Sequence, residues 1–171
     1  SSLKQSKASG LTICGLCSKF ISIIYIWKYQ VFKRSLYTCS LVSEQYDWIY
    51  NTIKEDLLLE SISGGTEIIG CFFMGTPIHP VRRGEITCKA LGMAVDILDQ
   101  RGASVIGKKG ELVCTQPFPS MPLTFWGEDG DERYFDAYFS KHEGIWTHGD
   151  LVEQTIEGTY IIHGRTDTVL N

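Results

Sequence analysis

The clearest periodic pattern of apolar positions lies between residues 43 and 54. Apolar side chains recur there at the spacing of one helix face: Tyr46, Ile49, Tyr50 and Ile53. Ser43 has the side chain of a typical N-cap residue, and Lys54 suits the C-terminal end, where the helix dipole favours a positive charge. The pattern therefore predicts a helix that begins at Ser43 and buries one side.

Residues 57–74 combine short apolar runs with a glycine-rich stretch. Leu57-Leu58-Leu59 is typical of a short buried strand, and Ser61–Ile68 then holds two adjacent glycines. Gly64 and Gly65 favour a tight backbone turn, because glycine has no Cβ. A helix, a strand and a glycine-rich turn so close together indicate an α/β region.

From about residue 68 the pattern becomes mostly β. The predicted strands are Ile68–Met74, Met93–Leu98 and Glu111–Thr115, and the predicted turns are Asp99–Gly102 and Gly107–Gly110. Tyr134–Phe139 has the pattern of a short helix. The acidic run Glu128–Glu132 lacks the spacing of a calcium loop, so we expect a solvated turn there.

The last strands form a predicted hairpin. Leu151–Thr155 and Thr159–Ile162 are strand-like, with Glu157-Gly158 as the turn. A two-residue turn places Asp150 opposite Arg165 across the ladder. A carboxylate and a guanidinium at one sheet edge bind a ribose and a phosphate, or form a surface ion pair worth under about 1 kcal/mol. The spacing alone is compatible with both.

Residues 1–40 have a different character. Leu11–Trp27 is apolar but contains Lys19, and its length is at the lower limit for a membrane span. Phe20–Ile26 is β-branched and aromatic, which favours a buried strand, with membrane association as the alternative. Cys14 and Cys17 are closely spaced, but no second pair completes a zinc ribbon, so we expect free thiols in a reducing cytosol.

Composition narrows the class of protein. The 171 residues are 43% hydrophobic and 21% charged, which is typical of a folded chain long enough for one domain or for part of a larger one. The formal net charge is -4, and no stripe or block of Lys and Arg is present. We therefore expect no nucleic acid as a partner.

The glycine-rich stretch is also the first candidate for chemistry. Backbone N–H groups exposed by such a turn can cradle a phosphate. Thr66 adds a hydroxyl donor, and Glu67 supplies the carboxylate oxygen that Mg²⁺ prefers. The alternative is an ordinary strand-to-strand turn that binds nothing.

Four short motifs occur in the order and spacing of one enzyme family. They are Ser63–Glu67, Gly110–Val113, Thr147–Asp150 and Gly164–Asp167. With them, residues 43–171 resemble the adenylate-forming acyl-CoA synthetases, and most closely the branch that activates acetoacetate. The stretches that carry this closer likeness are Ser61–Ile68, Arg83–Ile86, Leu91–Val95, Gly110–Pro122, Ala137–Phe139 and Gly144–Trp146. Residues 1–40 do not share the pattern.

The resemblance implies a fold and a reaction. The expected fold is α/β: the end of an α/β subdomain, then a mostly antiparallel β-rich subdomain, within a partial AMP-binding domain over residues 41–171. In the expected reaction an acid attacks ATP to give an acyl-adenylate and pyrophosphate, and CoA then displaces AMP. Acetoacetate, ATP, CoA and Mg²⁺ are thus the expected small molecules, and the cytosol is the expected location.

The resemblance also implies roles for the polar site residues. By match, Thr66 contacts phosphate and Glu67 binds Mg²⁺, and both serve catalysis. Asp150 resembles the Asp that binds the ribose, and Arg165 resembles the Arg that contacts the nucleotide.

Three further positions take roles from the same match. Gly64 and Gly65 belong to the nucleotide site. Gly64 also stands where acetate-activating enzymes have a Trp, so it leaves room in the acyl pocket for a longer acid. Asp167 matches the hinge about which a small C-terminal domain rotates.

Two parts of the family pattern are absent from the sequence. One is the upstream phosphate loop with its Lys, and the other is the C-terminal domain with the Lys that drives adenylation. We therefore expect a fragment of a ligase that is inactive alone. The alternative is a non-catalytic β-rich interaction domain or truncated relic.

Overall fold

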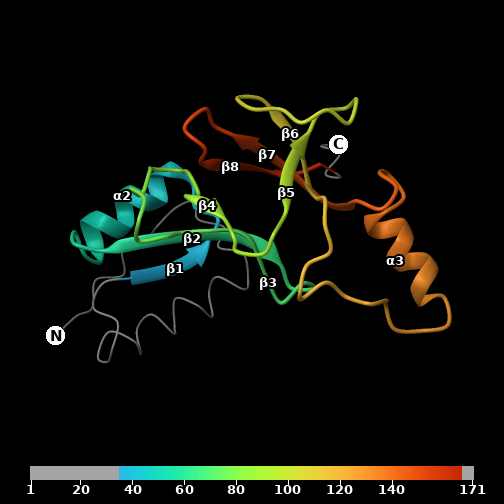
Figure 1. The fold of residues 1–171 in the computed structure, drawn as a ribbon. Helices are drawn as coiled ribbons and strands as arrows, with labels where there is room; N and C mark the ends of the chain where they lie inside the picture. Colours follow the sequence, from blue (N-terminus) through green and yellow to red (C-terminus); the bar gives the residue numbers. More distant parts are fainter. Residues whose placement is uncertain (1–34, 167–171) are drawn as a thin grey trace, which may run out of the picture. The chain divides into compact units, whose positions relative to one another are not determined.

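The structure, a computed structural model, describes residues 35–166 (Figure 1). The first sheet has the order β1-β2-β3-β4, with β1 (Ser35–Cys39), β2 (Leu58–Gly65), β3 (Gly70–Met74) and β4 (Cys88–Lys89). The second has the order β5-β6-β7-β8, with β5 (Val95–Leu98), β6 (Lys109–Cys114), β7 (Trp146–Gln154) and β8 (Tyr160–Arg165). The described helices are α2 (Ser43–Thr52) and α3 (Gly130–Tyr138).

Strands β1 and β2 run parallel, and α2 is the crossover between them (Figure 1). Parallel neighbours need such a crossover, because a tight turn cannot join them. Tyr46 and Ile49 of α2 pack with Leu59 of β2 in a small core. The predicted helix and its buried face are confirmed at these positions.

Two details of that helix prediction are wrong. The N-cap is Val42 and not Ser43, and the Gln45 side chain accepts the Val42 N–H at 3.0 Å. The Gln45 N–H in turn donates to the Val42 carbonyl at 3.0 Å, so these two contacts begin the helix without a polar cap side chain. Ile53 lies beyond the last helical residue as the C-cap and is 43% exposed, so it does not extend the buried face.

The glycine pair does not form the predicted turn. Gly64 and Gly65 are the last residues of β2 and pair with Cys71 and Gly70 of β3 in an antiparallel ladder. The chain reverses over residues 66–69 instead. The backbone here is that of a strand-to-strand turn, which was the alternative to a glycine-rich loop.

The second sheet is antiparallel throughout, as predicted for the β-rich part. One large core joins its inner face to the β2–β3 hairpin: Ile68, Phe72 and Phe73 pack with side chains such as Ile97, Leu112 and Trp146. Ile86 and Tyr160 also exchange two backbone hydrogen bonds, at 2.7 and 2.9 Å. The predicted fold class, α/β followed by antiparallel β, is confirmed.

Several predicted boundaries move. Strand β7 begins at Trp146, so the Thr147–Asp150 motif lies inside a strand and not before one. Helix α3 begins at Gly130, so part of the acidic run is its first turn and not a loop, although its acidic side chains are exposed as predicted. Asp131 and Glu132 fit there because acidic side chains are favoured at a helix N-terminus.

Three further predictions concern the N-terminal segment, membrane association and the state of the cysteines. Leu11–Trp27, Phe20–Ile26 and the Cys14–Cys17 pair lie outside the described residues. Among residues 35–166, no helix is both long and apolar enough to cross a bilayer. Cys71, Cys88 and Cys114 are free thiols.

Candidate functional site

The β2–β3 hairpin carries Thr66 and Glu67 at its tip. Ile69 donates its N–H to the Thr66 carbonyl at 3.2 Å. The φ angle of Ile69 is 47°, a value that β-branched residues rarely adopt. Ile68 is fully buried in the large core. Because Ile68 fixes the turn, Glu67 beside it is held at a defined place, with 31% of its side chain exposed.

The two glycines make room for this turn. A Cβ on Gly64 would lie 2.3 Å from the Gly70 carbonyl oxygen and 2.4 Å from the Cys71 Cα, so the strands approach too closely there for a side chain. A Cβ on Gly65 would lie 2.4 Å from Glu67 Oε2. Gly65 thus leaves the space into which the Glu67 carboxylate folds.

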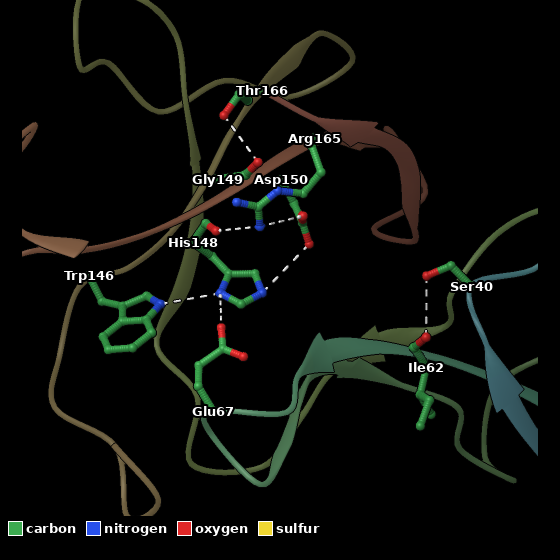
Figure 2. A network of polar contacts seen from close by, with 9 residues as sticks. All are labelled: Ser40, Ile62, Glu67, Trp146, His148, Gly149, Asp150, Arg165 and Thr166. Atoms are coloured by element: carbon green, nitrogen blue, oxygen red, sulfur yellow. Dashed lines mark hydrogen bonds and ion pairs between the residues drawn. The ribbon is translucent and has the colours of Figure 1, made fainter. Parts of the chain in front are cut away.

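Strand β7 carries His148 and Asp150 at a break in its pairing with β6. Residues 148–150 stand opposite Leu112 alone, because the register shifts there. Gly149, in the middle of the bulge, has a φ of 84°. Bulges re-aim side chains, and here His148 and Asp150 both point toward the hairpin tip (Figure 2).

Asp150 meets Arg165 across the β7–β8 ladder, and the predicted pairing is confirmed. Arg165 Nη1 lies 3.5 Å from Asp150 Oδ1 and donates to the His148 carbonyl at 3.0 Å. The Asp150 side chain is 11% exposed and that of Arg165 is 48% exposed. The pair is therefore half-buried, with the guanidinium on the solvent side.

His148 joins the two halves of the site (Figure 2). Its Nδ1 lies 3.6 Å from Glu67 Oε1, and its Nε2 lies 3.8 Å from Asp150 Oδ2. The ring is buried, with 3% of the side chain exposed. The structure thus brings Glu67, Asp150 and Arg165 close together, as one shared nucleotide site requires, while their roles in binding stay predictions.

Burial dominates the protonation of this cluster. Burial lowers the pKa of His148 more than the nearby Asp150 and Glu67 carboxylates raise it. Burial likewise raises the pKa of Asp150, against the opposing effect of His148 and Arg165. Both pKa shifts disfavour the charged form of the side chain. His148 is therefore neutral near pH 7, and its contacts with the carboxylates are not full ion pairs.

Helix α3 supports the site from a third direction. Tyr138 stacks on Trp146 with ring centroids 3.7 Å apart and an interplanar angle of 12°. Its hydroxyl hydrogen-bonds to Glu67, and burial together with this negative neighbour raises the pKa of Tyr138. A neutral phenol that donates to the carboxylate helps to orient the Glu67 side chain.

The site fits Mg²⁺ only if water and substrate supply most of the metal ligands. The described residues hold no group of three or more His, Cys, Asp or Glu side chains that could bind a metal by themselves. Mg²⁺, however, commonly binds one or two carboxylates and takes its remaining ligands from water and substrate phosphates. The partly exposed Glu67 carboxylate fits that mode.

Sequence reasoning missed His148 and Tyr138. His148 stands two residues before Asp150 in a strand, and residues at that spacing share a face. That spacing was the available signal, whereas the contact of Tyr138 with Glu67 depends on tertiary packing. Thr66 is exposed at the hairpin tip, and the predicted hinge residue Asp167 lies outside the described residues.

Comparison with known proteins agrees with these motifs. No family model matches the chain. Acetoacetyl-coenzyme A synthetase of Rhizobium meliloti (strain 1021) is 49% identical over 131 residues, which cover 77% of this chain and 20% of that protein. The solved acetoacetyl-CoA synthetase from Streptomyces lividans superposes with a TM-score of 0.72 at 36% identity, covering 81% of this chain and 22% of that one. Over the aligned region, this chain is therefore homologous to part of the acetoacetyl-CoA synthetases.

The similarity to acetoacetyl-CoA synthetases extends beyond the motif region. The acetoacetyl-CoA synthetase of Mus musculus is 40% identical over 172 aligned positions that cover 95% of this chain and 26% of that protein. That alignment therefore also runs through most of residues 1–40, which the motifs left unmatched. The chain spans about a fifth to a quarter of the length of these relatives.

Proposed function

We propose that this chain is the nucleotide- and magnesium-binding part of an acetoacetate–CoA ligase. The meeting of Glu67 and Asp150 on the two nitrogens of His148 carries the proposal. One nucleotide can thereby reach a metal-binding carboxylate and a ribose-binding carboxylate at the same time. A lone surface ion pair between Asp150 and Arg165 does not explain why Glu67, from a distant part of the chain, lies beside them.

Each residue then has one task in acyl-adenylate formation. Thr66 donates a hydrogen bond to a phosphate from the exposed hairpin tip. Asp150 accepts from the ribose hydroxyls, and Arg165 donates to the nucleotide from the solvent side. Glu67 holds Mg²⁺, which when bound neutralises charge on the phosphates of ATP.

Gly64 and Gly65 keep side chains out of this site. Gly64 also borders the acyl pocket in this proposal, where a larger residue would exclude acetoacetate in favour of a shorter acid. The acyl-adenylate then reacts with CoA to give the thioester and AMP. In the complete enzyme this reaction takes place in the cytosol and serves lipid and ketone-body metabolism.

The 171-residue polypeptide alone has too few groups for catalysis in this proposal. It corresponds to a minor part of its relatives, and electrostatic donors at such centres each contribute about 10²–10³ in rate. We expect it at most to hold AMP weakly, near the millimolar level. The non-catalytic alternative is not favoured, because the relatives are ligases.

A chimera tests the proposal. The matching segment of the Rhizobium meliloti enzyme is replaced by residues 43–166 of this chain, and acid-dependent exchange of labelled pyrophosphate into ATP is measured. We expect exchange with acetoacetate well above that with acetate. A folded chimera without exchange, or one that prefers acetate, would contradict the proposal. The Gly64→Trp chimera, if it folds, is expected to shift the preference toward acetate.

A further inference from the structure

His148 is the most enclosed polar side chain of the site. Phe72 of β3 meets its ring edge to face, with centroids 4.8 Å apart and an interplanar angle of 68°. Trp146 Nε1 donates to His148 Nδ1 at 3.5 Å. The ring also hydrogen-bonds to the Gly64 backbone. Contacts from two strands beside its own therefore leave the imidazole little freedom to rotate.

The Trp146 contact favours the tautomer of the neutral ring that carries its proton on Nε2. An indole N–H only donates, so Nδ1 accepts and offers its lone pair. In the neutral ring the proton then sits on Nε2, which faces Asp150 Oδ2 at 3.8 Å. That distance is longer than a hydrogen bond, so the attraction is between the N–H dipole and the carboxylate.

The same assignment gives Nδ1 a different relation to Glu67. Glu67 Oε1 lies 3.6 Å from a nitrogen that offers no proton to it. The ring therefore limits how far the carboxylate can turn inward, while the Tyr138 hydroxyl donates to it. Glu67 is thus held between the donating Tyr138 hydroxyl and the rigid His148 ring.

We propose that His148 is a positioning residue that sets where Glu67 and Asp150 present their carboxylates to one nucleotide. The inference rests on the proposed function. It assigns the ring no proton transfer and no metal ligation. Its content is geometric: one rigid ring orients Asp150 through Nε2–H and confines Glu67 through the opposite edge.

The Asp150 arm is tested with the full 171-residue chain, isotope-labelled and titrated with AMP by NMR. The His148→Gln variant keeps an amide N–H at the reach of Nε2, whereas His148→Asn is shorter and places its amide near Nδ1. We expect His148→Gln to bind AMP within about twofold of the unchanged chain, and His148→Asn to bind about tenfold more weakly, because it loses one oriented contact to a charged group. Both variants are polar, so a merely structural role would weaken both alike.

Two controls separate the possible results. His163→Gln changes an imidazole at the far side of the hairpin, 3.1 Å from Glu153, and should leave AMP binding unchanged. The Glu67 arm is tested by adding Mn²⁺ with ATP and measuring the broadening of NMR lines. The broadening should centre on residues 66–68 in the unchanged chain and spread further in the His148→Asn variant.

Equal AMP affinity and equal line broadening in the unchanged chain, His148→Gln and His148→Asn would overturn the positioning role alone. Absence of AMP binding to the unchanged chain would overturn the proposed nucleotide site and this inference with it.

Discussion

Asp150 lies opposite Arg165 in the β7–β8 ladder, although the turn that joins the two strands is not the one the sequence predicts. Near the turn, Gln154 pairs with Tyr160 and Val152 with Ile162, which is one residue out of the predicted register. A bulge then shifts the pairing back before it reaches Asp150. The bulge compensates for the longer turn, so the predicted pair forms.

Replacing Asp150 by Asn separates a binding role from a structural one. Because burial raises the pKa of Asp150, its ionised form is less stable in the folded chain than in the unfolded chain. This cost is absent below the unfolded pKa and complete above the folded pKa, so at pH 7 the Asn variant should unfold no more easily than the unchanged chain. AMP affinity should fall about tenfold, because a charged acceptor is lost.

The Asp150 variant is checked by thermal unfolding and by AMP titration. Asp136→Asn, on the exposed side of α3, is the matched control and should change neither quantity. If Asp150→Asn lowered the melting temperature strongly and left AMP binding intact, Asp150 would be a structural residue.

Glu67→Gln in the chimera keeps the volume of the side chain and removes its charge. We expect acetoacetate-dependent pyrophosphate exchange to fall by about 10²–10³, with an unchanged circular dichroism spectrum. The measurement is made at limiting Mg²⁺, where loss of a metal ligand has most effect. Glu143→Gln is the control at an exposed carboxylate. Near-normal exchange in Glu67→Gln would show that this carboxylate does not hold the metal.

Gly64 and Gly70 lie in the same hairpin but differ in the space beside them. A Cβ on Gly64 would lie 2.3 Å from a carbonyl oxygen, whereas the nearest atom to a Cβ on Gly70 is 3.5 Å away. Gly64→Ala should therefore lower the free energy of unfolding by about 1–3 kcal/mol more than Gly70→Ala, measured with urea. Equal losses would mean that close packing of β2 on β3 is not the reason for glycine at 64.

Cys114 should resist alkylation in the folded chain. The side chain is 1% exposed, and burial raises the pKa of its thiol, so little reactive thiolate forms at pH 8. Mass spectrometry after iodoacetamide treatment should find Cys114 unlabelled in buffer and labelled in denaturant. Labelling of Cys114 in buffer as fast as in denaturant would contradict the packing of β6 against the large core.

Local patterns predicted the elements better than the contacts between them. The 3.6-residue period identified α2, and the apolar runs identified β3, β5 and β6, because a buried face needs apolar residues at regular spacing. The extension of β2 through Gly64 and Gly65 could not be seen, since glycine usually signals a turn. Its reason is the close approach of β3, which only the tertiary structure shows.

The resemblance predicted one nucleotide site that includes both Glu67 and Asp150. Motif matching identified Glu67 and Asp150, but nothing in the spacing of the chain shows that one histidine lies between them. The position of His148 depends on the β7 bulge and on Phe72 of another sheet. The i, i+2 spacing of His148 and Asp150 shows only that they can share a strand face, and long-range packing decides what else that face contacts.

The central claim is that the β2–β3 hairpin tip and the β7 bulge bind the same nucleotide. Backbone amide chemical shifts of the full chain, followed during titration with AMP, test it most directly. We predict that the amides of residues 66–68 and of residues 148–150 shift together, with one common dissociation constant near the millimolar level. Shifts confined to one of these segments, or segments that respond with different dissociation constants, would contradict a single shared site.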